Sequence, residues 1–389
     1  MAEIMNFKIV TNSKLVEKGD TFVALGKGFD FIDEAKNRGA KKIIKGEKAF
    51  GQAAKKHLEN LREKNRDLKV IGITGSYGKT TTKDLLGFVL SKFGNTISAK
   101  GSFNNEIGVP ITIFEADGET QYLVLEMGAN AIGDLVYLTN IAPLDIACIL
   151  SIGSAHLGKF GSLENVKKAK SEIFEGLAQN GIGLIPENDE NCKEIFDKFP
   201  TKKITTFSEV PREKTETKLL GEHNLSNISA VEKICSLLDL DMEKVKSAIS
   251  KFLPISDHRL QLIEKAGLLF LDDSYNANPA SMKAALETFE KLNVDKKYAG
   301  KKYAVLGKME ELGDAEEKEH KKIGELFANS FIEKVLIYSS DDRHYFGENE
   351  KFIYFDNKDS IKDYISKTAQ NGDSILVKAS NSSKLWEII

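Results

Sequence analysis

The chain lacks long hydrophobic runs, and this absence excludes one large class of proteins. No apolar stretch among its 389 residues approaches the roughly 20 residues that cross a membrane as a helix. The segment Met1–Val10 also lacks the apolar core of a signal peptide. We therefore expect a cytoplasmic protein with no membrane span.

The chain also lacks an excess of one charge and any cysteine motif. Its formal net charge is −3, with both signs dispersed, whereas a protein that coats nucleic acid is strongly basic. We therefore expect no nucleic-acid partner. Cys148, Cys192 and Cys235 lie far apart and form no metal or redox motif. Cys148 and Cys235 fall on apolar patterns, which predicts reduced residues of the core.

The most informative segment present is a glycine-containing turn between an expected strand and an expected helix. The apolar run Leu68–Ile73 predicts the strand, and an apolar stripe within Asp84–Phe93 predicts the helix. The turn reads Thr74-Gly75-Ser76-Tyr77-Gly78-Lys79-Thr80-Thr81. Strand, glycine loop and helix together form the context of a phosphate-binding loop.

The residue types in this turn suit the binding of a polyphosphate. Glycines let backbone N–H groups turn toward phosphate oxygens, and the helix N-terminus adds partial positive charge. Lys79 can reach the β- and γ-phosphates, and Thr80 can place its hydroxyl on Mg²⁺. The general pattern has a glycine at position 73, where this chain has Ile73. An ordinary glycine-rich turn is the alternative interpretation.

Alternating strand and helix patterns divide the chain into three α/β segments. Residues 1–67 hold an expected strand and helix, and the segment then continues as a polar-faced helix. Residues 68–255 alternate strands and helices, which is typical of a mainly parallel sheet. Residues 256–389 repeat the alternation. We expect a small N-terminal α/β domain, a central P-loop parallel-sheet domain and a C-terminal Rossmann-like domain.

Two polar residues follow expected strands of the central segment. Glu126 closes the strand Tyr122–Leu125, and a carboxylate at the carboxyl end of a parallel strand faces the ligand crevice. It is a natural ligand for nucleotide-bound Mg²⁺. His156 lies in the loop after the strand that ends at Leu150. A metal or phosphate contact there competes with an idle, solvated histidine.

Lys170 lies in the middle of an apolar helix stripe. The expected helix Leu163–Leu177 carries Val166, Ile173 and other apolar residues on that face. A lysine on a buried face must extend to solvent, pair, or change its chemistry. Burial lowers its pKa, and the neutral amine can react with CO₂ to give an anionic carbamate. The pattern alone favours extension to solvent.

Further candidate residues cluster near the start of the third segment. Asp272, Asp273 and Tyr275 crowd a strand end where a nucleotide sugar or base could dock. Asn278 fits a helix N-cap followed by proline, which is a sufficient structural reason for its presence. Arg259 could pair with a phosphate.

Taken in order, these motifs resemble the Mur ligases, ATP-dependent amide-forming enzymes of bacterial cell-wall synthesis. The resemblance covers nearly the whole chain, through the phosphate loop, Phe103–Pro110, Glu126–Asn130, Ala155–Leu157, Lys170–Phe174, Gly221–Asn227 and Asp272–Met282. The last of these is similar to the stretch that distinguishes the D-alanyl-D-alanine-adding branch.

The resemblance implies roles for individual residues. The ATP site would comprise Gly75, Ser76, Tyr77, Gly78, Lys79, Thr80, Thr81, Asn224, Asn227, Arg259, Asp273, Tyr275 and Asn278. Two Mg²⁺ ions would be held by Thr80, Glu126, His156 and Lys170, with Lys170 carbamylated. The catalytic residues would be Lys79, Lys170 and His156. Substrate contacts would come from Ser13, Asn104 and Asn105.

The implied reaction joins D-Ala-D-Ala to a UDP-linked muramyl tripeptide through an acyl phosphate, in a monomer. Some positions depart from the family pattern: Asn12-Ser13-Lys14 stands where Asp-Ser-Arg is usual, Gly307-Lys308 where Gly-Asp is usual, and Lys378-Ala379-Ser380-Asn381 where Lys-Gly-Ser-Arg is usual. The first segment is also short. These departures leave the ATP chemistry intact and keep other acceptors open. A P-loop phosphotransferase and a non-catalytic nucleotide-binding protein are alternatives of other classes.

Overall fold

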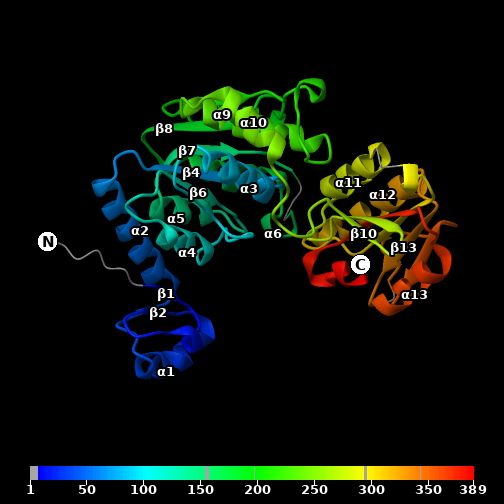
Figure 1. Ribbon diagram of the computed structural model, residues 1–389, viewed down its shortest axis with the longest axis horizontal. Coiled ribbons are helices and arrows are strands. Elements are labelled where there is room, and N and C mark those ends of the chain that lie inside the picture. The colour runs from blue at the N-terminus through cyan, green and yellow to red at the C-terminus, as the bar shows by residue number, and fades with distance from the viewer. Residues whose placement is uncertain (1–7, 154–156, 197, 293–295, 342) are drawn as a thin grey trace.

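The computed structural model describes residues 8–153, 157–196, 198–292, 296–341 and 343–389. The chain forms three sheets in succession, and Figure 1 shows the N-terminal sheet below the central domain and the C-terminal domain to the right of it. This arrangement confirms the expected α/β class with three domains. No helix in the described ranges is long and apolar enough to cross a membrane. Cys148 and Cys235 are buried and unpaired, as expected, and so is Cys192.

The N-terminal domain is small. Its parallel sheet consists of β1 (Ile9–Val10), β2 (Thr21–Ala24) and β3 (Lys42–Lys45), with α1 (Ile32–Asn37) beside it. The 18-residue helix α2 (Glu47–Lys64) then runs from this sheet to the central domain. Its buried residues Ala54 and Leu58 belong to the core of the central domain, so this helix ties the two domains together.

The central domain is a six-stranded, fully parallel sheet in the order β5-β6-β4-β7-β8-β9. Its strands are β4 (Lys69–Thr74), β5 (Thr96–Ser98), β6 (Tyr122–Glu126), β7 (Leu144–Ile149), β8 (Leu177–Pro186) and β9 (Lys203–Phe207). Helices cover both faces of this sheet. One face is covered by α3 (Lys79–Leu90), α9 (His223–Leu237) and α10 (Met242–Lys251). The other face is covered by α2, α4 (Gly108–Glu115), α5 (Asp134–Ile141) and α7 (Leu163–Ser171). Parallel strands buried on both faces read as continuous apolar runs, which is why β4 and β7 were recognisable in the sequence.

One expected helix is wrong in its length. The stripe predicted a helix over Leu163–Leu177, but α7 ends at Ser171 and a 3₁₀ turn over Glu172–Phe174 follows. A Cβ on Gly176 would lie 2.0 Å from Cβ of Thr139, so the chain approaches α5 closely there and turns into β8. Tertiary packing therefore overrides the helical pattern.

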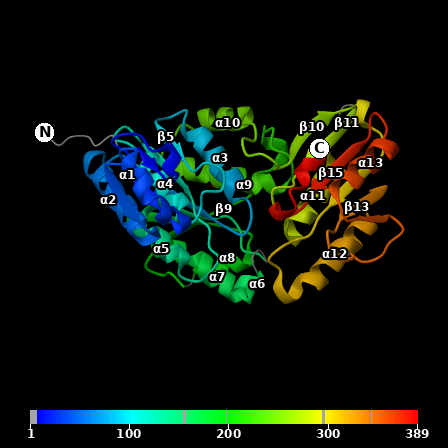
Figure 2. The same ribbon diagram turned by 90° about the horizontal axis from the view of Figure 1, so that it is seen from below.

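The C-terminal domain has a six-stranded mixed sheet in the order β10-β11-β15-β12-β13-β14. The strands are β10 (Gln261–Lys265), β11 (Leu268–Asp272), β12 (Lys302–Leu306), β13 (Lys334–Tyr338), β14 (Phe352–Phe355) and β15 (Ser374–Lys378). Only β10 is antiparallel. The helices α11 (Pro279–Lys291), α12 (Glu316–Ala328) and α13 (Lys358–Thr368) pack on this sheet. Figure 2 shows this domain facing the α3 and α9 side of the central domain.

Candidate active site

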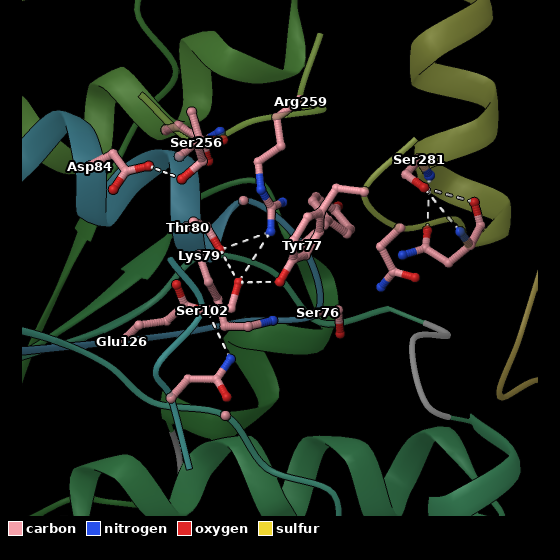
Figure 3. A pocket seen from close by; sticks show the side chains of 18 of the residues that line it. Ser76, Tyr77, Lys79, Thr80, Asp84, Ser102, Glu126, Ser256, Arg259 and Ser281 are labelled. Carbon is pink, nitrogen blue, oxygen red and sulfur yellow. Dashed lines mark hydrogen bonds between the residues drawn. The ribbon is translucent and has the colours of Figure 1, made fainter. Parts of the chain in front are cut away.

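A cleft of about 1000 Å³ opens between the central and C-terminal domains, at the carboxyl ends of the central strands. Its wall includes the turn after β4, the end of β6, the start of α9, and the segment from Ser256 to Ser281. In parallel α/β sheets, ligands bind at this edge of the sheet. Figure 3 shows side chains from the two domains converging there.

The turn after β4 is shaped by two glycines. Gly75 has φ +155° and Gly78 has φ +83°, and the second value is one that only glycine adopts readily. A Cβ on Gly78 would lie 2.4 Å from Oδ1 of Asn227 in α9. The turn is therefore packed against α9 with no space for a side chain at position 78.

Lys79 begins α3 and lies within this turn. Its Nζ donates a hydrogen bond to the carbonyl oxygen of Gly75 over 2.6 Å. Desolvation by the surrounding groups lowers the pKa of Lys79, while the carboxylate of Glu126 opposes that shift. The ammonium thus lies in the loop at the N-terminus of α3, where its charge and the partial positive charge of the helix end both attract anions.

Thr80 meets two residues from elsewhere in the chain. Its Oγ1 lies 3.3 Å from Oγ of Ser102 and accepts a hydrogen bond from Nη2 of Arg259 over 3.1 Å. Tyr275 donates through its hydroxyl to Ser102 over 2.9 Å, and the Arg259 guanidinium stacks 4.0 Å from the Tyr275 ring centre. This network joins the two domains at the mouth of the phosphate loop (Figure 3).

Glu126 ends β6 and is buried beside the loop. One carboxylate oxygen, Oε1, accepts from Nδ2 of Asn104 over 2.8 Å, and the other, Oε2, is buried without a hydrogen-bond partner. An unpartnered buried carboxylate oxygen is costly unless a cation or donor meets it. In the described part of the chain no three His, Cys, Asp or Glu side chains form a cluster that could hold a metal. Mg²⁺ commonly binds one or two carboxylates together with phosphates, so the residues fit a nucleotide-bound ion.

Lys170 lies in the same cleft and does not extend to solvent. Its exposed fraction is 1%, so the interpretation from the stripe alone is wrong. Burial lowers the pKa of Lys170 to about 7, and repulsion from Lys79 adds to this shift, while Asp134 and Glu126 oppose it. A large share of this amine is therefore neutral near pH 7, the form that reacts with CO₂.

The start of α9 supplies buried amides to the cleft. Asn227 donates through Nδ2 to Oδ1 of Asn224 over 2.7 Å, and Asn224 donates to the Leu220 carbonyl over 2.6 Å. Both side chains are almost fully buried and line the cleft beside His223. Burial also lowers the pKa of His223, which favours its neutral form. Neutral polar groups in an enclosed pocket suit the edge of a heterocyclic base.

Comparison with known proteins agrees with this geometry. The family model of the Mur ligase middle domain matches residues 73–215, and that of the Mur ligase glutamate ligase domain matches residues 258–381. The chain is 31% identical to the UDP-N-acetylmuramoyl-tripeptide–D-alanyl-D-alanine ligase of Bacillus subtilis, over 98% of this chain and 92% of that protein. The chain belongs to the Mur ligase family.

Three more similarities extend over nearly the full length of this Mur ligase. The Escherichia coli protein of the same name is 29% identical, over 100% of this chain and 94% of its own. Among solved structures, MurF from Acinetobacter baumannii matches with a TM-score of 0.89 and 29% identity, covering 98% of this chain and 92% of that one. MurF from Thermotoga maritima, in complex with ADP, has a TM-score of 0.86 at 28% identity and covers 100% and 97%.

Most of the residues predicted from the sequence line the cleft of this Mur ligase. Those that line the cleft are Ser76, Tyr77, Gly78, Lys79, Thr80, Thr81, Asn104, Asn105, Glu126, Lys170, Asn224, Asn227, Arg259, Asp273, Tyr275 and Asn278. Gly75 accepts the Lys79 hydrogen bond from within the loop. Ser13 lies outside the cleft, where it is buried and donates to Glu34 over 2.8 Å. His156 lies outside the described residues.

Some predicted residues have structural partners that account for them. Asn278 caps α11 by accepting from the Ser281 N–H over 2.9 Å, as its position before Pro279 suggested. Asp272 is fully buried and bonds His258, so the expectation that it crowds the nucleotide site is wrong. Asp273 remains in the cleft, paired with Lys378 at 2.7 Å.

Sequence reasoning missed Ser102 and Lys378 as site residues. Ser102 precedes the Phe103–Pro110 motif by one residue and contacts both Thr80 and Tyr275. Lys378 ends β15, and its buried ammonium also donates to the carbonyl oxygen of Asn276 over 2.6 Å. The position of Lys378 at the carboxyl end of a parallel strand was the signal that could have identified it.

Proposed function

We propose that this Mur ligase uses ATP to join D-alanyl-D-alanine to a UDP-N-acetylmuramoyl-tripeptide, as the names of its relatives state for those proteins. The observation that carries the proposal is the interdomain contact between Arg259 and Thr80 at the phosphate loop. We further propose that the domains span residues 1–67, 68–255 and 256–389, and that the protein acts as a cytoplasmic monomer.

In the proposed reaction, a carboxylate oxygen of the muramyl tripeptide attacks the γ-phosphorus of ATP. This step forms an acyl phosphate and breaks the bond to ADP. The amine of D-Ala-D-Ala then attacks the acyl carbon, an amide forms, and inorganic phosphate leaves. Activation is needed because an amine and a carboxylic acid in water exchange a proton and do not condense.

The residues of the cleft fit separate parts of this reaction. Lys79 and Arg259 would bind the oxygens of the transferred phosphoryl group, and the buried amides of Asn224 and Asn227 would bind the adenine. Asp273 and Tyr275 would contact the ribose side, with Asn104 and Asn105 on the substrate side. Ser13, which lies outside the cleft in the N-terminal domain, would contact the substrate there. The hydrogen bonds of Asn104 and the burial of Asn224 support these roles.

The cleft also fits Mg²⁺, which would neutralise phosphate oxygens when bound. Thr80 and Glu126 would hold one ion, and His156 with carbamylated Lys170 would hold a second. The unpartnered Oε2 of Glu126 supports the first site. The lowered pKa of Lys170 supports its carbamylation, since only the neutral amine adds CO₂.

The deciding experiment measures ADP release and amide formation with a panel of UDP-muramyl peptides, each with and without D-Ala-D-Ala. We expect amide product only with a tripeptide donor and D-Ala-D-Ala together, and none from the Lys79→Ala variant. A stable phosphorylated product would instead indicate a phosphotransferase. Amide formation with a different amine would change the acceptor and leave the ligase assignment standing.

A further inference from the structure

The turn that carries Arg259 has an unfavourable backbone conformation on both sides of the arginine. His258 has φ +61° and Leu260 has φ +49°, values in the left-handed region. Side chains other than glycine rarely adopt this region, and such residues persist only when their surroundings hold them. The direction in which Arg259 points therefore depends on what holds its two neighbours.

His258 is held along one edge by a buried carboxylate. Its Nδ1 lies 2.6 Å from Oδ2 of Asp272, and because a carboxylate oxygen accepts, Nδ1 carries the hydrogen. Asp272 is fully buried, and its Oδ1 accepts from the Ser274 N–H over 3.1 Å. The backbone of His258 is also fixed, since its N–H donates to Gln261 Oε1 and its carbonyl accepts from the Tyr275 N–H, each over 3.0 Å.

The face of the His258 ring is held by the only tryptophan of the chain. Trp386 stacks on the imidazole with ring centres 4.5 Å apart and an interplanar angle of 14°. It lies in the C-terminal 3₁₀ helix Leu385–Ile388, which Leu385 and Ile388 anchor in the core of the C-terminal domain. A residue at the far end of the chain thus contacts the turn that joins the two domains.

We propose that His258 is a positioning residue for Arg259. Asp272 and Trp386 fix the imidazole, the imidazole keeps the turn in its left-handed conformation, and the turn directs the guanidinium toward Thr80 and Ser102. Nη2 of Arg259 lies 3.1 Å from Thr80 Oγ1 and 3.4 Å from Ser102 Oγ, so a rotation of the turn would break both contacts. The inference rests on the proposed function, in which Arg259 binds the transferred phosphoryl group.

A double-mutant cycle tests whether His258 acts through Arg259. His258→Gly removes the imidazole contacts without backbone strain, because glycine adopts positive φ freely. We expect kcat/KM for ATP to fall about 10- to 100-fold, the range for a displaced reacting group. In the Arg259→Ala background the same change should have no further effect. Wild-type kinetics in His258→Gly, or losses that multiply in the double variant, would overturn the proposal.

Two further variants separate positioning from general stability. His258→Asn keeps a donor for Asp272 and tolerates left-handed φ, so it should retain kcat/KM within about threefold, a far smaller loss than a displaced arginine gives. His344→Ala is the matched control, because His344 also stacks on an aromatic ring, Tyr354, at 3.9 Å and 11°, but lies outside the cleft. A His258→Asn loss equal to that of His258→Gly would contradict the hydrogen-bond tether.

The single tryptophan gives a readout that needs no substrate. Removing the stacked imidazole should change the emission of Trp386, and unchanged emission in His258→Gly would mean that the contact does not form in solution. If His258→Gly does not fold, Trp386→Leu takes its place in the cycle with the same expected coupling to Arg259. The affinity for MgATP should be measured for wild type, both single variants and the double variant. This measurement tests the positioning role of His258 even if the tripeptide is not the substrate. A wild-type protein that forms no amide would contradict only the proposed function.

Discussion

Arg259 of the C-terminal domain donates a hydrogen bond through Nη2 to Oγ1 of Thr80 in the central domain, over 3.1 Å. The two residues are 179 positions apart in the chain, and only closure of the two domains brings them together. A nucleotide in the cleft would therefore meet groups from both domains at its phosphate end. We therefore expect phosphate binding to favour the closed arrangement of the domains.

The Arg259→Lys variant tests whether the planar guanidinium is needed. Lysine keeps the charge but loses the forked donors and the stacking on Tyr275. We expect kcat/KM for ATP to fall about 10- to 100-fold, since hydrogen bonds to charged groups contribute about 1.5–3 kcal/mol. Arg343→Lys on the outer surface of the same domain is the control and should leave the kinetics unchanged. Equal kinetics of Arg259→Lys and wild type would contradict a specific role.

The phosphate loop offers a prediction with a closely matched control. Gly78 and Gly347 have nearly the same φ, +83° and +86°, but a Cβ would meet Asn227 at position 78 and nothing within 4 Å at position 347. Both alanine variants carry about 1–2 kcal/mol of backbone strain. Only Gly78→Ala also displaces α9 from the loop, so it alone should lose MgATP binding in a titration. If both substitutions lowered the affinity for ATP equally, backbone strain at the glycine and not the contact with Asn227 would be the cause.

Much of the central domain could be predicted because its elements depend on local patterns. The buried strand β4 and the helix α3 followed from apolar runs, and the loop between them from its glycines. The absent glycine at position 73 also has a physical explanation, because Ile73 is fully buried inside β4 and the turn begins only at Gly75.

What the sequence could not provide was contact between distant segments. The left-handed turn at His258, its buried partner Asp272 and its stacking partner Trp386 come from three separate places in the chain. Lys170 shows the same limit, because an apolar stripe is compatible with a lysine that reaches solvent as well as with one that faces a closed cleft. Only the packing of α5 and α7 beside the phosphate loop decides between the two.

Lys170 should give the protein a distinctive pH dependence of stability. Burial lowers its pKa from 10.5 in the unfolded chain to about 7, so between these values the unfolded state binds a proton that the folded state has released. The free energy of unfolding should therefore rise with pH over this window, and the burial penalty is fully present below pH 7. Lys170→Met removes the penalty, so its advantage over wild type should be largest at pH 6.5 and shrink toward pH 9.

Thermal unfolding measures this difference in stability between Lys170→Met and wild type. The buffer must be free of CO₂, because a carbamate on Lys170 would change the charge of that side chain. Lys168→Met is the control, since Lys168 lies on the exposed face of the same helix. It should follow the wild-type pH profile throughout. Parallel profiles of Lys170→Met and wild type would mean that the amine of Lys170 is solvated in the folded protein.

A last prediction concerns another place where the two domains touch. Gly158 and Gly313 meet backbone to backbone, and a Cβ on Gly158 would lie 2.5 Å from the Gly313 nitrogen. The Gly158 N–H also donates to the Glu311 carbonyl over 3.0 Å, and Lys159 pairs with the Glu311 carboxylate beside it. This contact therefore holds the two domains together outside the lining of the cleft.

Gly158→Ala should hold the domains slightly apart at this contact, and it replaces none of the residues that line the cleft. Water would then reach the acyl phosphate, so less amide should form for each ADP released, while kcat for ADP release changes by only about a fewfold. Gly118→Ala is the control, because a Cβ there meets nothing within 4 Å. Measuring ADP and amide in the same reaction gives the ratio of amide formed to ADP released. A ratio of one in Gly158→Ala, as in wild type, would show that this contact does not exclude water from the intermediate.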